Sequence, residues 1–76
     1  MTNYEQWALN DLERDPASQL TSSELYASYC AWAQWNNKYI YSHKAVVQDL
    51  QRAGGIKRRG ANGRRYVIGF RFRAGI

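Results

Sequence analysis

Three side chains that can hydrogen-bond to nucleic-acid bases are spaced to share one face of a helix in the middle of the chain. Lys44, Gln48 and Gln51 lie at positions i, i+4 and i+7, so a helix over residues 43–53 would place them in one line. A lysine ammonium can donate to the acceptor atoms of guanine, and a glutamine amide can make a two-point contact with adenine. A helix in the major groove presents such a line to successive base pairs. Polar residues also cover any solvated helix face, so this spacing alone does not predict DNA binding. It indicates DNA binding only together with the basic segment that follows the helix.

The segment that follows this candidate helix is strongly basic. Lys57-Arg58-Arg59 precedes a Gly60-Ala61-Asn62-Gly63 turn, and Arg64-Arg65 follows it. Arg and Lys bind phosphate oxygens, and Arg is favoured in a narrow minor groove. Such a hairpin can also be merely solvated, or bound to an acidic protein surface. The candidate DNA contacts of both elements are Ser42, His43, Lys44, Gln48, Gln51, Arg52, Lys57, Arg58, Arg59, Asn62, Arg64 and Arg65.

Charge is distributed unevenly along the 76 residues, whose formal net charge is +5. Residues 1–37 carry a net charge of −4, and residues 38–76 carry +9. Eight basic residues and no acid lie between Arg52 and Ile76. This polarity within one small chain indicates a polyanion as partner. The alternative is a basic surface that only aids solubility.

The composition excludes several kinds of site. Cys30 is the only cysteine, and the chain has one His, which excludes a disulfide framework and a metal centre built on Cys or His clusters. The hydroxyls and the thiol lack a base arranged beside them. We therefore expect no enzymatic activity, no catalytic residues, no metal and no cofactor. Because no apolar run approaches the roughly 18 residues of a membrane span and no signal peptide is present, we expect a cytoplasmic protein without a membrane partner.

Local signals predict two helices before the candidate recognition helix. The first spans about 4–14 and ends before Asp15-Pro16, because the residue before a proline avoids helical dihedral angles; residues 15–20 then form a connection. The second spans 22–35, with Thr21 as N-cap and Glu24 completing a capping box. Its apolar residues recur at helical spacing, which predicts that they enter the core. They are Leu25, Tyr29, Trp32 and Ala33, flanked by Tyr26 and Cys30.

A third helix and a β-hairpin complete the chain. Ser42 caps the helix over 43–53, whose buried side holds Val46 and Leu50, and Gly54-Gly55 ends it. The hairpin, a candidate wing, spans 56–73 around an Asn62-Gly63 turn in which both residues can take positive φ. Alternation in its second strand predicts two faces. Tyr66, Ile68, Phe70 and Phe72 would face the core, and Arg65, Val67, Gly69, Arg71 and Arg73 would form a cationic face.

Three helices followed by a basic hairpin predict an α+β winged helix-turn-helix fold in a single domain over residues 1–76. The residues also resemble a family in their order and spacing. They are Leu25-Tyr26, Tyr29 and Trp32, then Ser42, Val46, Leu50 and Gly54, then Ile56, Lys57-Arg58-Arg59, Gly63-Arg64 and Gly69-Phe70. Over residues 4–73 the chain resembles the C-terminal winged-helix DNA-binding domain of phage- and plasmid-encoded primase–helicases. This sequence differs from the family at two points. Val46 stands where the family usually has a large aromatic residue, and one additional glycine lies between Leu50 and Ile56. The Walker motif of the ATPase is absent.

The resemblance implies a role in replication of a phage, plasmid or other mobile element, with double-stranded DNA at an origin or template as partner. Single-stranded DNA is the alternative ligand, with bases stacking on Trp35, Tyr39 or Tyr41. Primase–helicase or other replication proteins would be further partners. Two other functions stay open: a winged-helix module that binds a protein, and a small phage regulator such as a repressor or excisionase.

Overall fold

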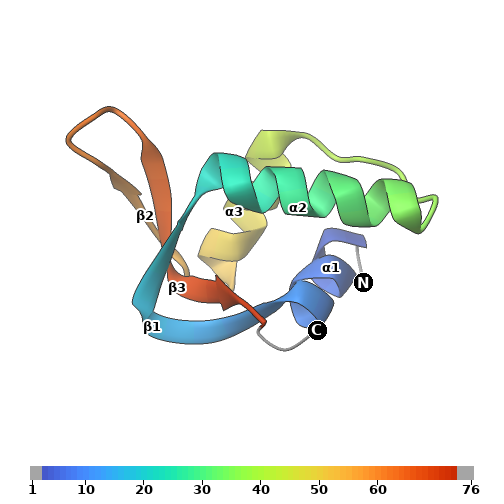
Figure 1. Ribbon diagram of the computed structural model, residues 1–76, viewed down its shortest axis with the longest axis horizontal. Helices are drawn as coiled ribbons and strands as arrows, with labels where there is room; N and C mark the ends of the chain where they lie inside the picture. Colours follow the sequence, from blue (N-terminus) through green and yellow to red (C-terminus); the bar gives the residue numbers. More distant parts are fainter. Residues whose placement is uncertain (1–2, 74–76) are drawn as a thin grey trace.

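The computed structural model describes residues 3–73, which form a small α+β domain of three helices and one antiparallel sheet (Figure 1). The three strands are ordered β1-β3-β2. This architecture is compatible with the expected winged helix. In chain order the elements are α1 (Asn3–Asp11), β1 (Leu12–Thr21), α2 (Ser22–Trp35), α3 (His43–Arg52), β2 (Ile56–Arg59) and β3 (Arg65–Phe72).

The first part of the chain differs from the sequence prediction. The helix expected over 4–14 ends at Asp11, and the connection expected over 15–20 belongs to β1. This strand pairs antiparallel with β3, from Leu12 opposite Phe72 to Thr21 opposite Tyr66. Long-range pairing therefore determines the conformation of β1, and no local alternation of apolar residues predicts this strand.

A bulge accommodates Pro16 in the middle of β1. The register shifts between Asp15, opposite Gly69, and Gln19, opposite Ile68, so Pro16 lies where the ladder needs no N–H donor. The Asp15 carboxylate closes the bulge by accepting hydrogen bonds from the Ser18 hydroxyl at 2.8 Å and the Ala17 N–H at 3.1 Å. These two bonds hold the pKa of Asp15 below its ordinary value.

The same irregularity changes which side chains of β3 face the core. Gly69 has a φ of 115° and lies beside the bulge. On one side of it Val67 is fully buried, and on the other Phe70 is buried. The predicted alternation is therefore wrong for Val67, Tyr66 and Ile68, because the face of the strand that meets the core switches at Gly69. Phe72, also predicted to face the core, is exposed at the end of the strand.

The predicted ends of the second and third helices are confirmed. The side chain of Thr21 accepts from the Glu24 N–H at the start of α2, and Ser42 accepts from the Ala45 N–H at the start of α3. At the end of α3, Gly54 has a φ of 105° and the Gly55 N–H donates to the Leu50 carbonyl at 2.9 Å, which is a Schellman termination.

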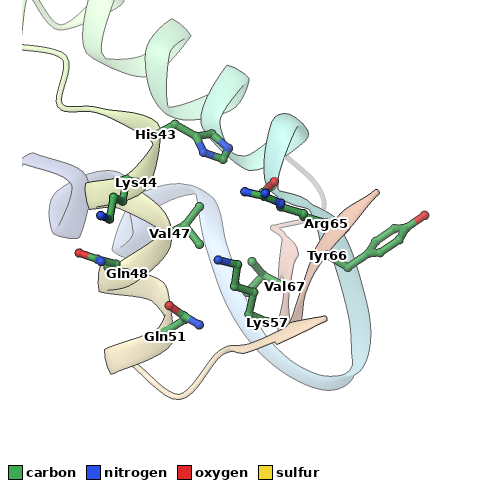
Figure 2. A pocket seen from close by; sticks show the side chains of 10 residues that line it. His43, Lys44, Val47, Gln48, Gln51, Lys57, Arg65, Tyr66 and Val67 are labelled. Atoms are coloured by element: carbon green, nitrogen blue, oxygen red, sulfur yellow. The ribbon is translucent and has the colours of Figure 1, made fainter. Parts of the chain in front are cut away.

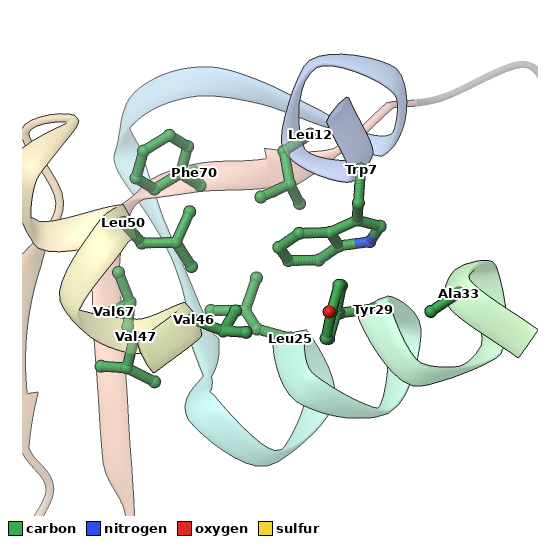
Figure 3. Close-up of a cluster of buried hydrophobic side chains, with 10 residues drawn as sticks. All are labelled: Trp7, Leu12, Leu25, Tyr29, Ala33, Val46, Val47, Leu50, Val67 and Phe70. Carbon is green, nitrogen blue, oxygen red and sulfur yellow. The ribbon is translucent and has the colours of Figure 1, made fainter. Parts of the chain in front are cut away.

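All three helices and the sheet contribute to one core (Figure 3). Trp7 is fully buried, and its indole N–H donates to the Ser28 hydroxyl at 3.1 Å. Trp32, expected in the core, is only half-buried against it. Within residues 3–73 no helix combines the length and apolar character needed to cross a membrane. The buried cluster consists of Trp7, Leu12, Leu25, Tyr29, Ala33, Val46, Val47, Leu50, Val67 and Phe70.

Candidate nucleic-acid interface

The polar face of α3 and the basic hairpin meet at one pocket of about 260 Å³ (Figure 2). Six of the twelve candidate contacts line it, although they come from elements separated in the sequence. The pocket is lined by Ser22, His43, Lys44, Val47, Gln48, Gln51, Lys57, Arg65, Tyr66 and Val67. None of these residues is acidic.

The α3 side of the pocket holds the predicted line of hydrogen-bonding side chains. Lys44, Gln48 and Gln51 are exposed. Val47 lies between them on the same helix, is buried, and forms an apolar part of the pocket lining. His43 is half-buried, because its ring packs edge-on against Tyr26 with ring centroids 5.1 Å apart. The helix therefore offers one cation and two neutral amides to a ligand.

The hairpin side of the pocket is cationic. The side chains of Lys57 and Arg65 extend towards α3, whereas the Tyr66 ring points away (Figure 2). Arg59 lies directly opposite Arg65 in the antiparallel pair, and both are exposed. Like charges at directly opposed positions destabilise a sheet. A bound anion would relieve that repulsion.

Within residues 3–73, the positive charges of this surface have no acidic partner. Within the part of the chain that the structure describes, both ion pairs involve Arg71, with Glu13 at 2.5 Å and Asp15 at 3.8 Å. These contacts lie along β1 and β3, away from the pocket residues. No ion pair within residues 3–73 consequently engages Lys44, Lys57 or Arg65.

Six candidate contacts lie outside the pocket. Ser42 acts as the N-cap of α3, and Arg52 is exposed at the other end of that helix. Arg64 lines a second hollow together with Thr21, Ser23 and Arg65. The remaining three are exposed residues of the hairpin: Arg58, Arg59 and Asn62.

Asn62 has a structural role in the hairpin turn. Its side-chain oxygen accepts from the Arg64 N–H at 3.1 Å, and the Gly63 N–H donates to the Gly60 carbonyl at 3.0 Å. Positive φ was expected at both Asn62 and Gly63, but only Gly63 has it, at 81°. The turn over residues 60–63 thus contains one left-handed residue, and glycine adopts that conformation without a steric penalty.

Sequence reasoning missed Arg14, which positions α3 on the sheet. Its guanidinium donates to the Ala53 carbonyl at the C-terminal end of α3, and lies 5.2 Å from the centroid of the Phe70 ring. A cation at this end complements the helix dipole. No local sequence signal links Arg14 to this role, because Ala53 lies 39 residues further along the chain.

The far side of α3 has a different character. Asp49 lies there beside Glu5 of α1 and borders an apolar hollow of about 410 Å³. Burial and the nearby Glu5 carboxylate raise the pKa of Asp49. Among the described residues no group of three or more His, Cys, Asp or Glu side chains could hold a metal ion. Acidic side chains thus border this side of α3, whereas none lines the pocket on its other side.

No protein-family model matches this chain, and no curated protein matches it significantly.

Proposed function

We propose that this protein is a non-enzymatic DNA-binding module of the winged-helix type, with α3 in the major groove and the β2–β3 hairpin on the backbone or minor groove of the duplex. The observation that carries the proposal is the pocket without an acid, in which α3 amides and hairpin cations converge. The order α1-β1-α2-α3-β2-β3 with sheet order β1-β3-β2 supports the winged-helix assignment.

The two sides of the pocket suit two parts of a duplex. Gln48 and Gln51 can hydrogen-bond to base edges, because their amides are exposed on one line of α3. Lys57 and Arg65 flank that line from the hairpin and suit the phosphates at the groove edge. The hairpin projects beyond the helices (Figure 1), which gives it access to a neighbouring groove or backbone.

The biological setting that we propose is replication of a phage, plasmid or other mobile element. It rests on the resemblance of residues 4–73 to the winged-helix domain of primase–helicases. Double-stranded DNA is the proposed partner in that setting, and a replication protein would be bound through another surface.

The test is the salt dependence of binding to a random duplex, measured by fluorescence anisotropy of a labelled oligonucleotide. Each phosphate contact that is lost lowers the slope of log K against log salt by about 0.9. The double variant Lys57→Ala/Arg65→Ala should therefore lower the slope by about 1.8 and weaken binding to every sequence. The matched control is Arg71→Ala, because this arginine is already paired with Glu13.

An unchanged slope in the double variant would mean that the hairpin does not contact phosphates. If the wild-type protein fails to bind duplex even at low salt, the DNA proposal is wrong. The basic surface would then fit an acidic protein partner instead.

A further inference from the structure

The connection between α2 and α3 presents large aromatic rings to solvent. Trp35, at the end of α2, is 90% exposed, and Tyr39 is 73% exposed. Packing explains the other tryptophans, since Trp7 is fully buried and Trp32 is half-buried against the core. Neither Trp35 nor Tyr39 lines the duplex pocket. The two rings therefore need another explanation.

Hydrogen bonds to the main chain hold this connection in place. The Tyr29 hydroxyl accepts from the Tyr41 N–H at 2.9 Å, and the Tyr26 hydroxyl donates to the Tyr41 carbonyl at 2.8 Å. The side-chain amide of Asn3 donates to the Tyr39 carbonyl at 2.5 Å. A segment fastened at both residues presents its side chains with little ordering cost on binding.

Tyr41 supports the exposed ring of Tyr39. Its own ring packs at right angles to that of Tyr4, with centroids 5.2 Å apart, and to that of Tyr39, at 4.9 Å. These edge contacts fix the orientation of Tyr39 while most of its ring remains open to solvent. The Tyr39 ring is therefore already oriented and exposed before any ligand binds.

The stretch of sequence that carries these rings is basic. The chain has no acidic residue from Leu25 to Gln48, and this stretch includes the exposed Lys38 and Lys44. Asn36 and Asn37 add exposed polar groups between the rings, and the one aliphatic residue between Trp35 and Ser42, Ile40, packs against the core. Beyond its rings, this surface therefore offers polar and cationic side chains and no further exposed aliphatic area.

We propose that Trp35 and Tyr39 form a stacking platform for the bases of a single-stranded nucleic acid, with Lys38 and Lys44 attracting its phosphates. Bases of any sequence can stack on aromatic rings, and nearby cations follow the backbone. This site is separate from the duplex pocket and goes beyond the proposed duplex function. Lys44, five residues after Tyr39 in the chain, also lines the duplex pocket.

The test measures binding of a 15-nucleotide oligo(dT) to the full chain, with oligo(U) of the same length as a second probe. Stacking should quench tryptophan fluorescence, because Trp35 is the exposed tryptophan. Trp35→Leu and Tyr39→Leu should each weaken binding by about five- to 100-fold, and Trp35→Leu should abolish the quenching. Tyr39→Phe should keep wild-type affinity, because stacking needs the ring and not the hydroxyl.

Two controls separate this site from the duplex pocket. Leu9→Ala removes an apolar side chain that is 63% exposed on α1 and should change neither affinity. The Leu variants should bind duplex within about twofold of wild type, so failure of the duplex proposal would leave this test intact.

Three results would overturn the proposal. The first is equal affinity of the Leu variants and wild type for both single strands. The second is Tyr39→Phe behaving like Tyr39→Leu. The third is a dimer that becomes monomeric in Trp35→Leu while single-strand affinity is unchanged, because a second copy of the chain would then cover the rings.

Discussion

At the scale of single residues, charge separates the side chains proposed to read bases from those proposed to contact phosphates. Lys44, Lys57 and Arg65 would be attracted to any nucleic acid. Gln48 and Gln51 are neutral and exposed on the same surface, so non-specific attraction cannot account for any effect of their removal. These two amides therefore offer the cleanest test of sequence recognition.

We predict that Gln48→Ala weakens binding to a specific site by about 1–3 kcal/mol and binding to random duplex very little, because the lost contact is to a base edge. The salt slope should not change, since no charge is removed. Paired binding isotherms on a selected site and on random duplex measure both effects. Gln34→Ala is the matched control, because Gln34 is an exposed glutamine on α2. Equal losses on both duplexes would show that α3 only positions the domain.

At the scale of elements, the tyrosine hydroxyls that fasten the α2–α3 connection make it sensitive to alkaline pH. Burial raises the pKa of the Tyr29 hydroxyl above its ordinary value near 10. The neutral hydroxyl is therefore the form that the fold favours. The corresponding stability is fully present below pH 10 and is lost as the pH rises through the folded-state pKa.

Tyr29→Phe should lower the free energy of unfolding at pH 8 by about 1–3 kcal/mol, because the Tyr41 N–H loses its acceptor. Above pH 10 the variant should lose less further stability than wild type. The remaining loss comes from Tyr26, whose pKa burial also raises. Urea unfolding at pH 8 and pH 11 measures the difference, with Tyr39→Phe as the control on an exposed ring. If the free energy of unfolding falls equally between pH 8 and pH 11 in wild type and Tyr29→Phe, this explanation is wrong.

The elements also differ in how far the sequence could predict them. Helices α2 and α3 carry local signals at both ends, and their caps at Thr21 and Ser42 are confirmed. Strand β1 could not be predicted, because it contains Pro16 and three consecutive charged residues and forms only by pairing with β3.

The candidate site was also predictable only in part, because local signals predict some of its features and tertiary packing produces the others. The line of Lys44, Gln48 and Gln51 follows from helical spacing alone, whereas their convergence with Lys57 and Arg65 on one pocket depends on tertiary packing. The positioning role of Arg14 was equally out of reach, because its partner Ala53 lies 39 residues away.

At the scale of the whole molecule, a core of few side chains carries the stability of a short chain. Trp7 is its largest fully buried side chain. It packs against Tyr29 with ring centroids 5.7 Å apart, which joins α1 to α2. A domain of this size has little stability to spare.

Trp7→Ala should therefore cost about 3–5 kcal/mol, the range for removing a fully buried aromatic side chain. Trp32→Ala should cost clearly less, because Trp32 is only half-buried. Urea denaturation followed by far-UV circular dichroism measures both values. Equal losses for the two variants would contradict the burial seen in the structure.

The sheet order leaves β2 at an edge, and all four of its side chains are exposed. An exposed edge strand can recruit a strand from another molecule, which is a route to aggregation. Three of the four residues here, Lys57, Arg58 and Arg59, are cations, and the fourth, Ile56, is 62% exposed. Repulsion between these cations keeps the edges of two copies apart. The charges proposed to contact DNA would thus also oppose edge-to-edge pairing, and a hairpin neutralised at all three positions would leave an uncharged edge open to a strand of another copy.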